Sequence, residues 1–153
     1  MTIKRPKRFL RKGEKGQSLA EFVLVLPIFL ILVFAIIDFG LGFHAWLTVT
    51  NSAREGARLG AVRAPAFGVC DYDPSTKATN IKCRVYETAD SLDKAKLNVL
   101  VTGDQGTPGS SVVVQVDYDY DLITPLDSML GLISGGRVGP TIKFTSKADM
   151  RLE

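Results

Sequence analysis

Residues 16–47 of the chain read GQSLAEFVLVLPIFLILVFAIIDFGLGFHAWL, a long and almost uninterrupted apolar stretch. No residue from 22 to 37 carries a charge, and only Pro27 interrupts the helix-forming side chains. A helix needs about 20 residues to cross the hydrocarbon core of a bilayer. The apolar run, extended to residue 47 and broken only by Asp38 and His44, exceeds that length. We therefore expect a membrane-spanning helix.

A basic leader precedes this helix. Residues 1–16 hold seven of the 19 Lys and Arg residues of the chain but one of its 16 Asp and Glu residues. The net positive charge of the chain therefore comes from the leader, and it does not indicate nucleic-acid binding. Positive charge beside a membrane span marks the cytoplasmic side. We expect the N-terminus in the cytoplasm and everything after the helix outside it.

A cleaved secretory signal is the alternative interpretation of the same pattern. The basic start and the apolar run both suit a signal peptide, whose apolar part is about 7–15 residues long. The small-x-small exit site is poor, because the run continues through Ile36, Ile37, Asp38 and Phe39. We therefore favour a helix that stays in the membrane over conventional cleavage after the run.

The helix is expected to continue well beyond the membrane. The proline-free continuation over residues 38–62 makes a helix of residues 17–62 on the order of 70 Å long. Small residues recur in this part at helical spacing and would let another backbone approach closely: Ala53, Gly56, Ala57, Gly60 and Ala61. This small-residue stripe could pack against the protein's own globular part or against the helix of another subunit, and the stripe alone slightly favours the first.

The two cysteines, Cys70 and Cys83, lie on the expected outer side, where disulfides persist. They stand among turn-forming residues, which suits a loop closed by a disulfide worth about 3 kcal/mol. A metal site would need further ligands, and the single histidine, His44, lies in the helix. We therefore expect a Cys70–Cys83 disulfide and no metal.

Residues 63–153 are expected to form a small α+β head. Residues 63–83 read as a loop, residues 84–92 as a short amphipathic helix and residues 125–140 as a loop with one helical turn. Strands are expected at about residues 96–102, 111–121 and 141–151, where apolar residues alternate with polar ones.

In each of the two longer strands, the alternation places one row of side chains on the core face of the sheet and one row on the solvent face. The outward row of residues 111–121 is acidic and that of residues 141–151 is largely basic, so antiparallel pairing would set opposite charges side by side. The expected fold is thus α+β: a long N-terminal transmembrane helix followed by a head built on an antiparallel sheet.

No group of residues carries the pattern of a catalytic site. His44 has no Ser or Cys partner nearby, and the glycine-rich stretches lack the lysine and the strand–helix context of a phosphate loop. The row Asp117, Asp119 and Asp121 offers hard oxygen ligands, but a spacing of two is that of any exposed strand face. We expect no enzyme activity, no cofactor and no small-molecule substrate.

The start of the helix carries a chemical signal of its own. A carboxylate, Glu21, stands five residues after Gly16 inside the apolar run, where a charge is costly unless it is paired. Cleavage between Gly16 and Gln17 would free the helix from its leader and create an amine at Gln17. Glu21 could then neutralise the amine of a neighbouring subunit. An exposed glutamate at the headgroups is the simpler alternative.

With its NSAREGAR segment at residues 51–58, this stretch resembles the TadE-like family, the minor pilins (pseudopilins) of tight-adherence, or Flp-type, pili. The resemblance is strong over residues 16–62 and looser in the head. It implies a structural subunit cut by a prepilin peptidase, with Gly16 before the cut, Gln17 as the new N-terminus, Glu21 as the pilin glutamate and Phe22 as its aromatic neighbour. The implied setting is pilus assembly for adhesion, biofilm formation or DNA uptake.

We therefore expect a leader at residues 1–16, a long helix at residues 17–62 and an extracytoplasmic head at residues 63–153. The expected location is the bacterial inner membrane or a pilus. The expected partners are the bilayer, the prepilin peptidase and other pilin and Tad assembly subunits. The first alternative is a binding module that the helix merely tethers to the membrane. The second is a pseudopilin of a type II secretion or type IV pilus system.

Overall fold

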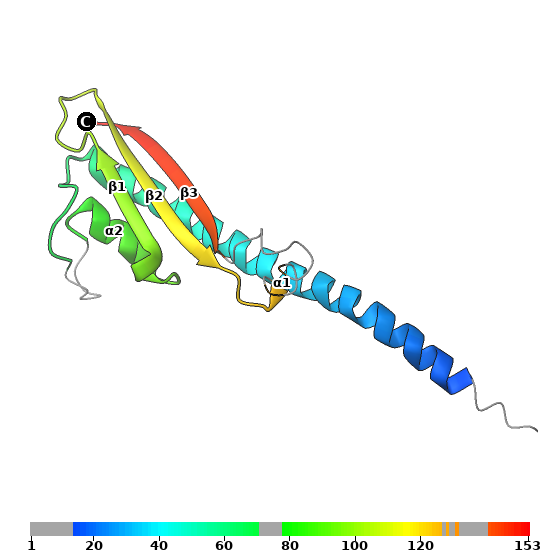
Figure 1. Cartoon of the computed structure of the whole chain (residues 1–153). Helices are drawn as coiled ribbons and strands as arrows, with labels where there is room; N and C mark the ends of the chain where they lie inside the picture. The colour runs from blue at the N-terminus through cyan, green and yellow to red at the C-terminus, as the bar shows by residue number, and fades with distance from the viewer. Residues whose placement is uncertain (1–13, 71–77, 127, 129–130, 132–140) are drawn as a thin grey trace, which may run out of the picture.

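The computed structural model describes residues 14–70, 78–126, 128, 131 and 141–153. It confirms the α+β fold, with a long helix leading into a small head (Figure 1). The elements in chain order are α1 (Glu14–Ala61), α2 (Ile81–Thr88), a 3-10 turn η1 (Lys94–Lys96), β1 (Leu97–Thr102), β2 (Ser111–Asp121) and β3 (Thr141–Arg151).

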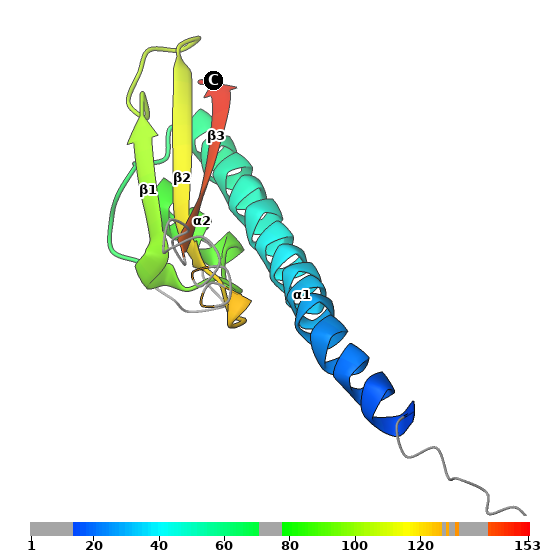
Figure 2. The same ribbon diagram turned by 45° about the vertical axis from the view of Figure 1, so that its right-hand side comes forward.

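Helix α1 has two parts with different surroundings. Its 48 residues run without a break through Pro27, and at 1.5 Å per residue they span about 70 Å. The N-terminal part extends away from the head, whereas the C-terminal part lies along the sheet (Figures 1 and 2). Asp38 is the first buried residue of α1 among those described, followed by Gly42, Ala45 and Val49. Because these residues are three or four apart, one face of the helix packs on the head.

The three strands form an antiparallel sheet in the order β1-β2-β3. Every second residue of β2, from Val112 to Tyr120, is buried, as the alternation predicts. Helix α1 contacts β2, β3 and α2, so the core of the head forms where these elements meet. Val114 and Val116 of β2 are fully buried in this core.

The short helix begins earlier than expected. The sequence predicted it at residues 84–92, but α2 covers Ile81–Thr88, which shortens the preceding loop. Asn80 caps the helix: its side-chain oxygen accepts the backbone N–H of Cys83 at 2.8 Å. Such a cap satisfies one of the free N–H groups at a helix start. Residues 71–77 of that loop and most of the loop expected at 125–140 lie outside the described residues.

The strand register pairs fewer opposite charges than the two rows suggested. Asp119 lies opposite Lys143, with a nitrogen–oxygen distance of 3.7 Å. Asp117 instead lies opposite Thr145, whose hydroxyl donates to it at 2.7 Å. The rows are therefore complementary mainly through hydrogen bonds, because the register sets polar rather than charged residues across from most of the aspartates.

Candidate functional site: the stem helix and its junction with the head

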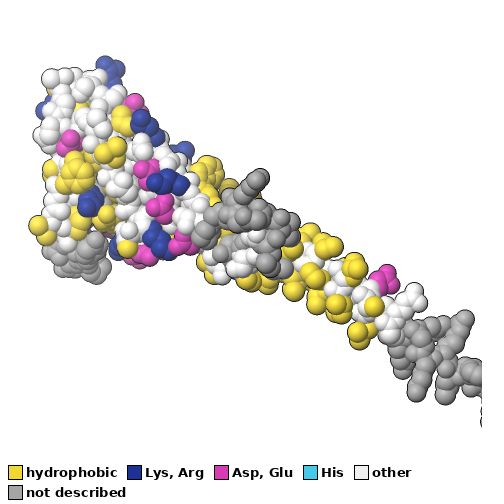
Figure 3. All heavy atoms as spheres, in the orientation of Figure 1, with side chains coloured by type: hydrophobic (Ala, Val, Ile, Leu, Met, Phe, Trp, Pro, Cys, Tyr) yellow, Lys and Arg dark blue, Asp and Glu magenta, His cyan; other side chains and the backbone are white. Residues whose placement is uncertain are grey.

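The stem, by which we mean residues 16–37 of α1, presents an apolar surface. Leu24 is 71% exposed and Ile28 65%. The helix Gly16–Ala61 contains a window of mean hydropathy 3.0 and is long and apolar enough to cross a membrane. Figure 3 shows hydrophobic side chains dominating the stem, while charged ones gather on the head. An exposed apolar surface of this extent is typical of a segment covered by lipid or by other helices.

The residues predicted to take part in processing lie on the first turns of α1. Gln17 and Glu21 are four apart, so they share one face of the helix, with a rise of about 6 Å between them. Glu21 and Phe22 are exposed, and no described atom outside α1 lies within 4 Å of a Cβ atom added at Gly16. Within the described part of the chain, Glu21 forms no ion pair. The roles of these residues in cleavage and pairing remain predictions.

Four residues of the small-residue stripe, Ala53, Gly56, Ala57 and Gly60, pack against the protein's own head, and the fifth, Ala61, is half-buried. Ala53 and Ala57 are fully buried. A Cβ atom at Gly56 would come within 2.6 Å of Val85 in α2, and one at Gly60 within 3.0 Å of Val112 in β2. The small residues therefore let α1 approach both α2 and the sheet closely, and another helix has no space on this face.

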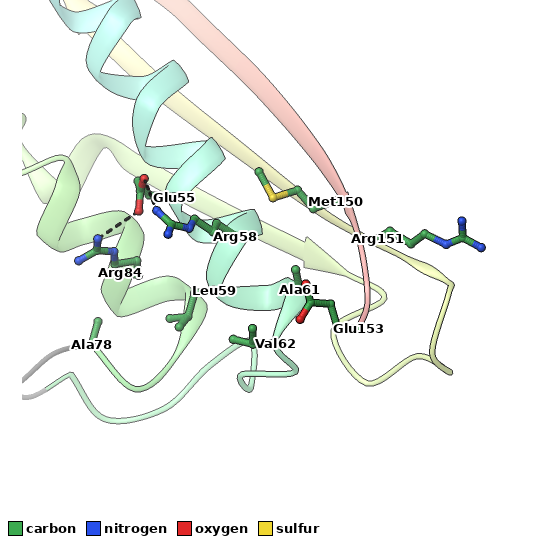
Figure 4. Close-up of a pocket in the computed structure, with 10 residues that line it drawn as sticks. All are labelled: Glu55, Arg58, Leu59, Ala61, Val62, Ala78, Arg84, Met150, Arg151 and Glu153. Atoms are coloured by element: carbon green, nitrogen blue, oxygen red, sulfur yellow. Dashed lines mark hydrogen bonds and ion pairs between the residues drawn. The ribbon is translucent and has the colours of Figure 1, made fainter.

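The NSAREGAR segment also contacts α2 through an ion pair made by its glutamate, Glu55. Glu55 pairs with Arg84 of α2 at 3.1 Å, and Arg84 also pairs with Glu87 at 3.0 Å. The hydrogen bonds to Glu55 and Glu87 raise the pKa of Arg84 above its ordinary value. The pair lies at one edge of a groove of about 640 Å³ at the end of the head remote from the stem (Figure 4). Arg58 also lines this groove. Its side chain is largely exposed, and its distance of 3.9 Å from Glu55 is longer than that of Arg84.

At the other end of the head, Asp38 joins α1 to the segment after β2. Its side chain accepts the backbone N–H groups of Ile123 at 3.1 Å and Thr124 at 3.3 Å, and also the hydroxyl of Thr124. The Tyr120 hydroxyl donates to the Asp38 carbonyl at 3.5 Å, and burial, with Asp38 nearby, raises the pKa of Tyr120. Asp38 is only 4% exposed, so these donors replace water.

The expected disulfide between Cys70 and Cys83 is confirmed, with a Cα–Cα distance of 5.3 Å. It ties the loop after α1 to the first turn of α2, where Asn80 also bonds Cys83. The loop is further fixed where the Asp104 carboxylate accepts the backbone N–H of Ala66 at 2.9 Å. Together these contacts anchor the chain that connects α1 to the head.

The row of aspartates on β2 serves the sheet itself. Asp121 accepts bonds from Lys96 and Thr141, each at 2.7 Å. The bond from Lys96, then that from Thr141, holds the pKa of Asp121 below its usual value, and Asp121 in turn raises that of Lys96. These contacts join η1, β2 and β3 on the exposed face.

Two residues with clear structural roles did not emerge from the sequence as sites. Asn80 had a detectable signal, because Asn before a short apolar-periodic segment is a helix N-cap pattern. Asp38 had only a general signal, a lone acid in an apolar helix, which indicates a partner without identifying it. Its partners, Ile123 and Thr124, lie 85 and 86 residues further along the chain.

Comparison with known proteins gives one match. Residues 16–58 match a family model described as TadE-like protein. Searches of curated proteins and of solved structures give no match. The matched region begins at Gly16 and ends at Arg58, so it contains the stem, Asp38 and the NSAREGAR segment. The family match therefore confirms the resemblance of this chain to the TadE-like family over the long helix.

Proposed function

We propose that the protein is a TadE-like minor pilin, a structural subunit that assists assembly of a Tad pilus for adhesion. The observation that carries the proposal is the family match over residues 16–58, which coincides with a helix able to cross a membrane. The stem would lie in the inner membrane, with the N-terminus in the cytoplasm and the head outside. The Cys70–Cys83 disulfide supports an oxidising location for the head.

In this proposal a prepilin peptidase removes residues 1–16. Gly16 is the residue before the cut, and among the described residues nothing outside α1 crowds it, which is compatible with access by the peptidase. The new amine at Gln17 would meet Glu21 of a neighbouring subunit, because a carboxylate in an apolar helix bundle requires a charged partner. The other pilin and Tad assembly subunits are the proposed partners.

The test is co-expression with a matching prepilin peptidase, followed by intact-mass measurement of the membrane-extracted protein. We expect a loss of mass equal to residues 1–16, and no loss with an inactive peptidase or with Gly16→Leu. An intact leader beside a peptidase that cuts another prepilin in the same cells would refute the processing step. The same measurement reports whether the disulfide has formed.

The role of Glu21 has a separate test. Glu21→Ala and Glu21→Gln should both insert into the membrane normally and be incorporated poorly into the pilus, because both remove the negative charge. Glu21→Asp, which keeps the charge, is the matched control. Normal incorporation of Glu21→Gln would show that charge pairing at this position is not required.

A membrane-tethered binding module is the second candidate. The observation that favours it is that the small-residue stripe is buried within the chain, so this face is not available to another subunit. The tethered module would need neither Gly16-dependent processing nor Glu21. The two experiments above therefore discriminate between the candidates.

A further inference from the structure

An apolar groove lies at the base of the head, where the stem ends. Its volume is about 490 Å³. One wall is α1, with Phe39, Phe43 and Trp46; the other is the sheet, with Ile142 and Phe144. The three aromatic rings of α1 form a ladder, since Phe39 stacks on Phe43 at 6.3 Å and Phe43 lies 5.7 Å from Trp46. Asp38 is the one charged residue among the described lining residues.

The length of the stem places this groove at the membrane surface. The hydrocarbon core is about 30 Å thick, which a straight helix crosses in about 20 residues. Glu21 is the one charged residue of the stem. With Glu21 at the cytoplasmic edge of the hydrocarbon core, the opposite edge lies close to residue 41. The aromatic ladder from Phe39 to Trp46 therefore begins inside the hydrocarbon boundary and ends among the headgroups, a depth at which aromatic rings are enriched.

The hydrogen bonds of Asp38 bring the head to the same depth. A carboxylate at this boundary is costly unless donors surround it, and the donors come from Ile123 and Thr124 in the head. Ile123 is nevertheless 69% exposed, and Ile142 at the rim of the groove is 44% exposed. The segment that satisfies the carboxylate and the start of β3 thus each present an apolar side chain at the level of the lipid.

We propose that the base of the head docks into the bilayer leaflet on its own side, with phospholipid acyl chains filling the groove and Ile123 inserted beside them. Asp38 acts as the latch that holds Ile123 and Thr124 at this depth. The occupant is lipid because the helix that forms one wall of the groove is the direct continuation of the stem, and the described lining offers no charge free to pair with a protein partner. The inference rests on the membrane-spanning stem of the proposed function.

Depth-dependent fluorescence quenching tests this docking in the full chain. Trp46 is the single tryptophan, so Trp46→Phe gives a silent background into which one reporter at a time is introduced. The reporters are Ile123→Trp at the base of the head, Leu32→Trp in the stem and Val69→Trp as the matched head control, exposed by 69%, 56% and 92% in the native chain. Each variant is reconstituted in phosphatidylcholine vesicles brominated either near the headgroup or near the chain ends.

We expect shallow bromines to quench Ile123→Trp more than deep ones, deep bromines to quench Leu32→Trp, and neither to quench Val69→Trp. Quenched Leu32→Trp with unquenched Ile123→Trp would overturn the docking while leaving the membrane-spanning stem intact. That result would also follow if a second copy or another segment of this chain covered the base. Unquenched Leu32→Trp would instead refute the membrane span itself.

The latch has its own test in the Ile123→Trp background. Asp38→Leu removes all the acceptor oxygens of the side chain, so we expect the shallow quenching of Ile123→Trp to fall. Asp38→Asn keeps a carbonyl oxygen for the N–H groups and should largely preserve it. Circular dichroism melting of each variant checks that the head is folded. A folded Asp38→Leu protein with unchanged quenching would refute the latch.

Discussion

The close approach of α1 to the head at Gly56 predicts an unusual sign for a glycine-to-alanine substitution. Inside a helix this change ordinarily stabilises by up to about 1 kcal/mol, because alanine has less backbone entropy to lose. At Gly56 the new methyl would stand 2.6 Å from Val85, 3.3 Å from Val114 and 3.4 Å from Ile81. These three side chains are fully buried and branched at Cβ, so they have little freedom to move aside.

Overpacking a closed core of this kind costs about 1–3 kcal/mol. After the gain in helix propensity, we expect Gly56→Ala to lower the free energy of unfolding by about 1 kcal/mol. Gly56→Val adds two more methyl groups at the same place and should cost about 3 kcal/mol or more. For a chain of this size, the second change corresponds to a fall in melting temperature of roughly 10 °C.

The assay is thermal unfolding of the full chain in detergent micelles, followed by circular dichroism. Gly40→Ala is the matched control, because Gly40 lies in the same helix and no described atom outside that helix lies within 4 Å of its added methyl. That variant should melt at or above the native temperature. If Gly56→Ala is as stable as Gly40→Ala, the close packing of α1 on α2 and β2 is wrong.

Three further predictions concern the attachment of α2 and its loop. Replacing both Cys70 and Cys83 by alanine should cost about 3 kcal/mol, and reductant should lower the melting temperature of the native chain but not that of the double variant. Asn80→Ala removes the cap of α2 and leaves the Cys83 N–H without its partner, so we expect a loss of about 1 kcal/mol in urea unfolding, whereas Asn80→Ser should recover part of it. A double-mutant cycle between Glu55 and Arg84 should give a coupling energy of about 0.5–1 kcal/mol. The same cycle between Glu55 and the exposed Arg58 is the control and should give a value close to zero. Equal coupling energies would contradict the specific role of the Glu55–Arg84 pair.

The regular elements were predictable because their patterns are local. A window of about 10–20 residues is enough to recognise the strand alternation of β2 and the apolar run of the long helix. The start of α2 was misplaced because amphipathic spacing over residues 84–92 competed with the capping signal of Asn80. Strand pairing was correct in direction, but the rows of charge did not reveal the register, which sets Asp117 against Thr145.

In the candidate site, too, the local features were predictable and the contacts between distant residues were not. The stem and its acid at Glu21 are visible in the sequence because a charge in an apolar run is a local anomaly. The partners of Asp38 could not be identified, because they lie more than 80 residues away along the chain. The small-residue stripe had two interpretations because glycine and alanine at helical spacing permit close packing on any partner, and only the tertiary structure identifies which one.

The burial of that stripe constrains how subunits can meet if the protein is assembled into a pilus. The face of α1 that packs on the head is not available, so any contact that α1 makes with a neighbour must use the stem or the opposite face of the helix. Leu47, Asn51, Arg54 and Arg58 are exposed along that opposite face at spacings of three and four. Its two arginines favour a partner that supplies carboxylates, whereas the stem is mainly apolar and carries one charged side chain, Glu21. Substituting Arg54 by glutamate should therefore impair incorporation into the pilus without changing the melting of the isolated chain. Incorporation at the native level would show that Arg54 on this face of α1 is not needed for assembly.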